Sequence, residues 1–255
     1  TSLMVVMTAQ RAVLVFLFTL AMCGASGWLA TGKLRRLDPA EIPFGRPFLP
    51  GFVAMAGYIR AAAEDVLAGR ADVMLAGGCS RPDCQYTQMG FAQLRALAPS
   101  GRCSPFDARA DGLVVGEGAG VFVLKRLADA LNHGDTIHAT VAGVGLSNDM
   151  YGNLLAPAME GQLRAMRAAY ERAGWHPRDV QLVECHATGT PVGDAVEFES
   201  LRQLWSGSRW SAGQCALGAV KANVGHLLTG AGAAGLIKVL LALRNETLPP
   251  VPNFS

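Results

Sequence analysis

Residues 183–238 constrain this chain more than any other stretch. Two short apolar runs lie within it, and a histidine follows each, His186 after the first and His226 after the second. Glycines stand near both histidines, and Lys221 precedes His226 by five residues. Strand ends followed by glycine-containing turns are where α/β proteins place polar side chains for chemistry. We therefore expect one pocket that contains both imidazoles and the ammonium group.

The residues of this expected pocket suit a substrate carbonyl that gains negative charge. A neutral imidazole, such as that of His186 or His226, donates a hydrogen bond to an enolate or oxyanion. Lys221 supplies a positive field nearby and tunes the imidazoles. The hydroxyls of Thr188 and Thr190 are suited to hydrogen-bond a polar arm of the substrate. The pattern predicts chemistry through an enolate or oxyanion and leaves the substrate open.

Short apolar runs alternate with segments of helical period from residue 54 onward, and this alternation predicts an α/β fold. Strands are expected at residues 72–76, 118–124, 137–146, 180–185 and 215–220. Helices are expected at residues 58–67, 90–97, 128–132, 160–173, 195–204 and 229–243. The first strand should close at Gly77 and Gly78. The helix at 195–204 should turn Val196, Phe198, Leu201 and Leu204 inward, and the apolar helix at 229–243 should be buried.

The composition excludes several classes of protein. Hydrophobic residues make up 51% of the chain and charged residues 16%, which supports a sizeable core and argues against disorder. A formal net charge of +2 gives no indication of a nucleic-acid binder. The six cysteines include no C-x-x-C pair, so they predict reduced thiols in a cytoplasmic protein.

Neither a cofactor nor a metal is expected. Residues 230–235 (GAGAAG) match the spacing of the dinucleotide-binding motif G-x-G-x-x-G. They fall inside an expected helix rather than directly after a strand, so we interpret them as small residues that permit close helix packing. His133, His138 and His176 lack the spacing of metal ligands and are expected at the surface.

The beginning of the chain differs from the rest. Residues 12–32 carry no charge, with Arg11 before them and Lys33 after them. Three interpretations stay open: a buried strand or helix of the core, a membrane or export segment, and a truncated or out-of-frame 5′ end. Residues 33–50 contain four prolines and are expected to form a loop or linker.

Several ordered motifs resemble landmarks of the β-ketoacyl synthases (ketosynthases), which belong to the thiolase-like superfamily. The matching motifs are residues 184–190 (ECHATGT) with Gly193, Asp194 and Glu197, then 221–226 (KANVGH), 104–107 (SPFD), 110–112 (ADG) and 116–120 (GEGAG). The resemblance covers residues 54–255. It is nearer to polyketide and polyunsaturated-fatty-acid synthases than to the small stand-alone enzymes.

This resemblance implies a thiolase-like layered α/β fold (αβαβα), incomplete at both ends of the chain. Residues 1–53 then form an atypical N-terminal segment, 54–134 the remainder of the N-terminal half, and 135–255 the C-terminal half with both histidine motifs. The implied activity is an acyltransferase reaction of fatty acid or polyketide biosynthesis. In it, acyl and malonyl thioesters condense with loss of CO2.

The resemblance also implies the partners and the roles of residues. An acyl carrier protein brings the substrates on its phosphopantetheine, and the ketosynthase forms a homodimer or pairs with another ketosynthase. The implied catalytic residues are His186, His226 and Lys221. Thr188 and Thr190 would contact the phosphopantetheine arm. Asp194, Glu197 and Glu117 would support the site.

The nucleophile of the family has no evident counterpart here. A cysteine at the start of the helix before Gly77 and Gly78 would accept the acyl group, and the matching position is near Phe52. No cysteine lies between Cys23 and Cys79, and Cys23 is far upstream. Strand alternation turns Cys185 away from His186 and into the core.

We therefore expect condensation that depends on a cysteine to be absent or severely impaired. Two alternatives stay open. One is a malonyl thioester decarboxylase without a nucleophile, and the other is a non-catalytic partner of a full ketosynthase. A membrane-anchored form through residues 12–32 is a further possibility.

Overall fold

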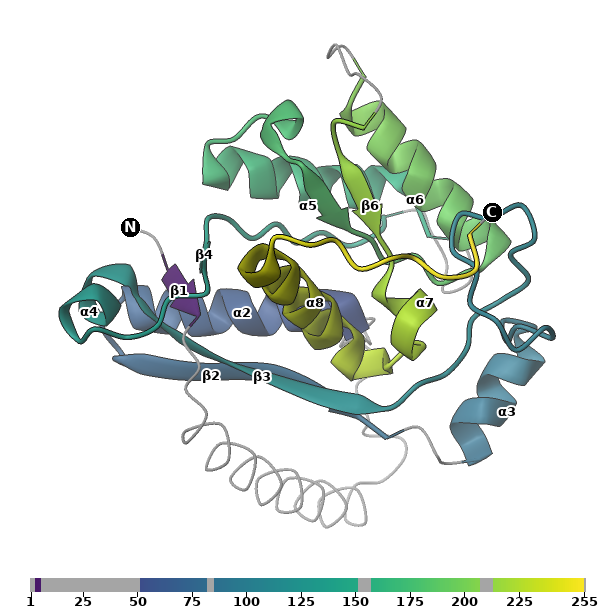
Figure 1. Cartoon of the computed structure of the whole chain (residues 1–255), viewed down its shortest axis with the longest axis horizontal. Coiled ribbons are helices and arrows are strands. Elements are labelled where there is room, and N and C mark those ends of the chain that lie inside the picture. The colour runs from purple at the N-terminus through teal and green to yellow at the C-terminus, as the bar shows by residue number, and fades with distance from the viewer. Residues whose placement is uncertain (1–2, 6–50, 82–84, 151–156, 207–212, 255) are drawn as a thin grey trace.

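The computed structural model describes residues 3–5, 51–81, 85–150, 157–206 and 213–254. Helices and strands alternate along this part of the chain, as the sequence predicts (Figure 1). The uncharged run at 12–32, the proline-dense segment at 33–50 and Cys23 lie outside the described residues. Among the helices that are described, none is long and apolar enough to cross a membrane.

The larger sheet has four strands in the order β2-β3-β1-β4. They are β1 (Leu3–Val5), β2 (Val73–Ser80), β3 (Gly118–Arg126) and β4 (Ala139–Val141). All three neighbouring pairs are antiparallel. The strand predicted at 137–146 is therefore much shorter than expected, because only Ala139–Val141 finds a partner strand among the described residues.

The expectation that the first strand closes at Gly77 and Gly78 is wrong. β2 continues through both glycines to Ser80, paired with β3 along its whole length. A Cβ on Gly77 would lie 2.3 Å from the carbonyl oxygen of Gly120, so the glycine permits a close backbone approach rather than a turn.

The smaller sheet consists of two parallel strands, β5 (Leu182–Glu184) and β6 (Ala216–Gly218). Both occur inside the predicted strands, and both are shorter than predicted. Val183 pairs with Leu217, and the backbone N–H of Cys185 extends the pairing by donating to the carbonyl of Gly218. The two strands end side by side, so the segments that follow them begin at the same edge of the sheet.

Two helices form a layer between the sheets, α2 (Gly51–Leu67) and α8 (Ala231–Asn245) (Figure 1). A further pair, α5 (Met159–Ala173) and α6 (Pro191–Leu204), covers the other face of the smaller sheet. The shorter α-helices are α3 (Gln85–Gln93), α4 (Leu127–Asn132) and α7 (Val220–Val224). Two 3₁₀ turns, η2 (Pro177–Asp179) and η3 (Leu228–Gly230), complete the described helices. The helix predicted at 90–97 is displaced toward the N-terminus: α3 begins five residues before residue 90 and ends four residues before residue 97.

The main core lies between α2, α8 and the larger sheet. Its buried members are Met55, Ile59, Ala62, Val66, Ala76, Phe122, Leu124 and Ala233. Full burial of a Leu or Phe side chain stabilises the fold by about 1.5–3 kcal/mol. The apolar pattern of residues 58–67 predicts one inner face with Ile59, Ala62, Ala63, Val66 and Leu67. Ile59, Ala62 and Val66 are buried, whereas Leu67 at the end of the helix is 45% exposed.

The prediction that the helix at 229–243 is buried is confirmed for most of its first half and, in its second half, for Ala242. Ala231, Gly232, Ala233 and Gly235 are buried, whereas Leu241 and Leu243 are half-exposed. A Cβ on Gly120 of β3 would lie 2.9 Å from the Cβ of Ala233. The small residues therefore permit close packing of α8 on β3, as the sequence predicts.

The predicted inner face of α6 is partly wrong. Leu201 is buried, but Phe198 is 50% exposed, and its ring contacts that of Phe106 with centroids 6.4 Å apart. The inward positions of the first turns are taken by two carboxylates, Asp194 and Glu197, which bind backbone N–H groups of a neighbouring loop.

Candidate active site

The two histidines predicted to share a pocket are neighbours in the structure. His186 follows β5 and His226 follows α7, and their ring centroids lie 5.6 Å apart with the rings at 85°. One ring therefore presents its edge to the face of the other. The pairing follows from the parallel register of β5 and β6, which brings both following segments to one edge of the sheet.

Backbone and side-chain hydrogen bonds fix the ring of His226. Its Nδ1 accepts from the backbone N–H of Leu228 at 3.0 Å, so the neutral ring carries its proton on Nε2. Its backbone N–H donates to the carbonyl of Val114 at 2.7 Å, and its carbonyl accepts from the N–H of Gly116 at 3.1 Å. These bonds connect the second histidine motif to the segment that precedes β3.

Both imidazoles are neutral at physiological pH. Burial and, to a smaller extent, the positive charge of Lys221 lower the pKa of His226 to about 3. Burial also holds the pKa of His186 well below its usual value, and the charges of Lys221 and His226 act in the same direction. A neutral imidazole with a fixed N–H is a donor already aimed at the place where negative charge develops.

Lys221 is buried beside the histidines, with 1% of its surface exposed. Its Nζ donates to the carbonyl oxygen of His186 at 2.5 Å. Burial lowers the pKa of this amine, and the carboxylates of Glu197 and Glu184 oppose the shift. The structure therefore brings Lys221 to His186 through the backbone of the first histidine motif.

Glu197 holds the backbone of that motif from α6. Its Oε1 accepts from the N–H of His186 at 2.6 Å, and its Oε2 accepts from the N–H of Ala187 at 2.7 Å. Burial raises the pKa of this carboxyl group, while the two backbone donors lower it. Glu197 thus supports His186 through the main chain.

Asp194 acts in the same way on the next residues. Its Oδ1 accepts from the N–H groups of Thr188 and Gly189 at 3.1 and 3.2 Å, and its Oδ2 accepts from the N–H of Phe106 at 2.9 Å. Burial raises the pKa of Asp194, and the three backbone donors oppose this. Since Asp194 and Glu197 are one helical turn apart, a single face of α6 carries both.

Of the remaining predicted residues, Thr188 and Thr190 lie next to one another, whereas Glu117 lies at the surface. The hydroxyl oxygens of Thr188 and Thr190 lie 2.7 Å apart and hydrogen-bond one another, and the Thr188 side chain is buried. The side chain of Glu117 is exposed, and within the described residues it makes no hydrogen bond or ion pair. No contact therefore connects Glu117 with the other predicted site residues.

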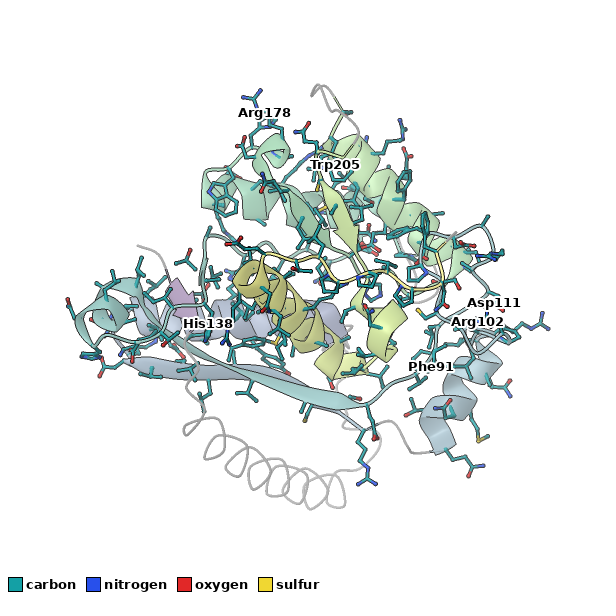
Figure 2. All side chains as sticks on the ribbon, in the orientation of Figure 1. Phe91, Arg102, Asp111, His138, Arg178 and Trp205 are labelled. Carbon is teal, nitrogen blue, oxygen red and sulfur yellow. The ribbon has the colours of Figure 1, made fainter. Side chains whose placement is uncertain are left out.

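Sequence reasoning assigned no role to the loop around Cys103. The Sγ of Cys103 donates to the carbonyl of Thr188 at 3.4 Å, and the Cys103 carbonyl accepts from the amide of Asn253 at 3.2 Å. Figure 2 shows Arg102 and Asp111 at the end of the molecule next to α3, so the same loop runs from that surface to the site. These contacts join residues 85 and 150 positions apart, and no local spacing in the sequence predicts such distant pairs.

The described cysteines near the site are protonated thiols. Burial, together with the charge of Asp194, raises the pKa of Cys103 to about 11. Cys185 is 3% exposed in the core, as strand alternation predicts, and burial raises its pKa as well. Phe52, the position matching the nucleophile of the resembled family, lies in the first turn of α2.

Two family profiles match the chain. The profile described as "Beta-ketoacyl synthase, N-terminal domain" matches residues 56–130, and the one described as "Beta-ketoacyl synthase, C-terminal domain" matches residues 138–255. Among curated proteins, the polyketide synthase ThaG of Burkholderia thailandensis is 44% identical over 198 residues. A phenolphthiocerol/phthiocerol polyketide synthase of Mycobacterium tuberculosis is 44% identical over 185 residues.

Solved ketosynthases have the same fold. The ketosynthase from module 6 of the bacillaene synthase of Bacillus subtilis superposes with a TM-score of 0.75 at 36% identity, covering 79% of this chain and 36% of that one. The PfaC ketosynthase–chain length factor superposes with a TM-score of 0.75 at 40% identity, covering 80% and 22%.

The chain spans only a small part of these curated relatives. The match covers 76% of this chain and 4% of ThaG, and 72% of this chain and 12% of the mycobacterial synthase. The two family profiles, the sequence relatives and the solved structures agree with the motifs that place His186 and His226 together. The chain therefore belongs to the β-ketoacyl synthase family of polyketide type and has its thiolase-like α/β fold.

Proposed function

We propose that this chain carries the site of a ketosynthase-type reaction, the decarboxylative condensation of acyl and malonyl thioesters delivered by an acyl carrier protein. The observation that carries the proposal is the pair of neutral imidazoles of His186, which is partly buried, and His226, which is buried, with ring centroids 5.6 Å apart. The names of the similar polyketide synthases support the same substrate class.

The site residues fit the chemistry of decarboxylation. The Nε2–H of His226 donates to the thioester carbonyl of the malonyl group. As the bond between the α-carbon and the carboxylate breaks, CO2 leaves and the electron pair moves into an enolate. The negative charge then rests on the oxygen that the imidazole contacts, which lowers the barrier. Lys221 supports this state indirectly, because its charge adds to the effect of burial, which keeps both rings neutral.

In the condensation step, the enolate carbon attacks the carbonyl of an acyl thioester. A carbon–carbon bond forms and the thiolate leaves with the electron pair of the broken C–S bond. We propose that Thr188 and Thr190 contact the phosphopantetheine arm, with their mutual hydrogen bond exchanged for one to the arm. Dimerisation or pairing with another ketosynthase is part of the proposal.

We further propose that the acyl-transfer half of the reaction is impaired in this chain. The family uses a cysteine to hold the acyl group, and the sequence has no cysteine from residue 24 to residue 78. Decarboxylation does not need that nucleophile and should remain. The two half-reactions can therefore be measured separately.

The test is release of labelled CO2 from a malonyl thioester of pantetheine. We expect release by the unaltered chain and a loss of about a hundredfold in His226→Ala, the order found when a donor to an oxyanion is removed. His176→Ala changes an exposed histidine and is the matched control. Undiminished release in His226→Ala, or no release from the folded chain, would overturn the proposal.

A further inference from the structure

Glu184 is a buried carboxylate to which the catalytic scheme above gives no part. It is the last residue of β5, and 7% of its side chain is exposed. Its Oε1 accepts from the backbone N–H of Val220, the first residue of α7, at 2.5 Å. A carboxylate at this place ties the end of one strand to the start of the helix that carries Lys221.

Two glycines make room for this carboxylate. A Cβ on Gly218 of β6 would lie 2.2 Å from Glu184 Oε2, and a Cβ on Gly235 of α8 would lie 3.2 Å from Glu184 Cγ. Neither site accepts a larger residue without a shift of the Glu184 side chain. Glu184 is therefore enclosed by β6, α7 and α8 together.

Lys238 of α8 compensates the buried charge. Its Nζ lies 3.1 Å from Glu184 Oε2, and 11% of its side chain is exposed. The two atoms form an ion pair without hydrogen-bond alignment, and within the described residues neither makes a hydrogen bond. Both residues border a cavity of about 280 Å³ whose other walls are largely apolar, including Leu217 and Val239. A buried charge in such surroundings is costly unless it is paired.

The anchored helix leads directly to the site. Lys221 follows Val220, and its Nζ donates to the carbonyl of His186. α7 has only five residues, so the N–H held by Glu184 lies within its first turn and close to the Lys221 backbone. The Glu184 charge also favours the ammonium form of Lys221, and only the charge of Glu197 does so more strongly.

We propose that Glu184, paired with Lys238, is a positioning residue of the active site: by holding the N–H of Val220 it sets the place and the charge of Lys221 against the carbonyl of His186. A role of Glu184 in catalysis rests on the proposed function. The contacts themselves exist whether or not the chain turns over a substrate, so they are tested by spectroscopy.

The chain has four lysines and five histidines, which makes both residue types practical NMR probes. The ammonium of Lys221 is followed by the ¹³Cε signal in a pH titration, and the histidines are followed by ¹⁵N ring signals. We expect Glu184→Gln to lower the titration midpoint of Lys221 by about one pH unit, since a nearby opposite charge is removed. The ring signals of His186 should move as well.

A matched control separates positioning from loss of stability. Asp135→Asn breaks another buried ion pair, in which Lys125 Nζ lies 2.5 Å from Asp135 Oδ2 with side-chain exposures of 9% and 12%. It should destabilise the chain but leave the Lys221 midpoint and the His186 signals unchanged. If Asp135→Asn moves these signals as much as Glu184→Gln does, or if neither variant moves them, the proposal is wrong.

The double variant Glu184→Gln/Lys238→Met keeps the proposal testable if the single variant Glu184→Gln does not fold. It removes both charges and leaves no lone charge in the apolar surroundings, so it should fold at least as well as the single variant. The Lys221 midpoint should again fall, because the carboxylate is absent. An unchanged midpoint in the folded double variant would overturn the proposal, even if CO2 release by the unaltered chain supports the proposed function.

Discussion

Ala187 has a φ of 41°, in the left-handed region that alanine rarely adopts. It stands between His186 and Thr188, so the direction of both side chains depends on this unusual backbone. The conformation costs about 1–2 kcal/mol. The hydrogen bonds from the N–H groups of His186 and Ala187 to Glu197 hold it in place. Strain of this kind is typical of functional sites whose geometry is fixed by the surrounding structure.

Gly189, two residues after Ala187, also has a left-handed backbone. Its φ is 77°, and an added Cβ would lie 2.8 Å from the carbonyl oxygen of Gly112. We expect Gly189→Ala to lower the free energy of unfolding by about 3 kcal/mol, from backbone strain together with this contact. Urea denaturation followed by circular dichroism measures the change.

Gly134→Ala is the control for that prediction. Gly134 has a similar φ of 65°, but an added Cβ would meet no atom within 4 Å. Gly134→Ala should therefore lower the free energy of unfolding only by the backbone strain, about 1 kcal/mol. Equal losses in the two variants would show that the approach of Gly189 to Gly112 contributes nothing.

Among the elements, helix α6 shows what hydrophobic periodicity alone does not predict, although the resemblance to ketosynthases implies that Asp194 and Glu197 support the site. The apolar pattern predicts that Phe198 faces inward, yet Asp194 and Glu197 occupy the inner face of its first turns. Hydrophobic periodicity assigns charged residues to the solvent. It misses a helix whose carboxylates are buried because they satisfy five backbone N–H groups of other segments.

Local patterns predicted the α/β class, the proximity of both histidines and Lys221, and the close packing of α8. They did not predict the extension of β2 through Gly77 and Gly78, because a glycine pair indicates a turn when its neighbours in space are unknown. The part taken by Glu184 was missed for the same reason, since its partner Val220 lies 36 residues further along. Glu117 lies within the family motif at 116–120, yet its exposed side chain makes no hydrogen bond or ion pair among the described residues.

The packing of two elements gives a further prediction. η3, the short 3₁₀ turn Leu228–Gly230, lies against β2, and a Cβ on Gly78 would be 2.2 Å from the carbonyl oxygen of Thr229. We expect Gly78→Ala to destabilise the chain by about 3 kcal/mol, because backbone must move. Thermal denaturation reports the loss.

Gly57→Ala is the control for Gly78→Ala. Gly57 lies within α2, and an added Cβ would meet nothing within 4 Å. The substitution should raise stability by about 0.5–1 kcal/mol, since alanine favours a helix interior over glycine. A loss in Gly57→Ala equal to that in Gly78→Ala would contradict the close approach of β2 and η3.

The whole molecule should lose stability in acid partly because of its buried imidazoles. Between pH 6.5 and about 3, the unfolded chain binds a proton at His226 that the folded chain does not bind. The contribution is therefore fully present above pH 6.5 and is lost as the pH falls through this window. His186 acts in the same direction. The raised pKa values of Asp194 and Glu197 act in the opposite direction, because these folded carboxyl groups hold protons to higher pH.

We predict that His226→Gln reduces the slope of unfolding free energy against pH by about 1.4 kcal/mol per pH unit in this window. Urea denaturation at a series of pH values from neutral to mildly acidic measures the slope. His176→Gln removes an exposed histidine and is the control. A slope in His226→Gln equal to that of the unaltered chain would mean that His226 is protonated in the folded state.

The bridge between His226 and the segment at 114–116 also matters for building chimaeras. The backbone of His226 exchanges hydrogen bonds with Val114 and Gly116, and Asp194 holds Phe106. A recombination breakpoint anywhere between residues 120 and 180 would join a histidine segment from one parent to a supporting loop from another. Exchanges between related synthases should therefore inherit residues 96–118 and 182–254 from the same parent, whatever donor supplies the helices between them.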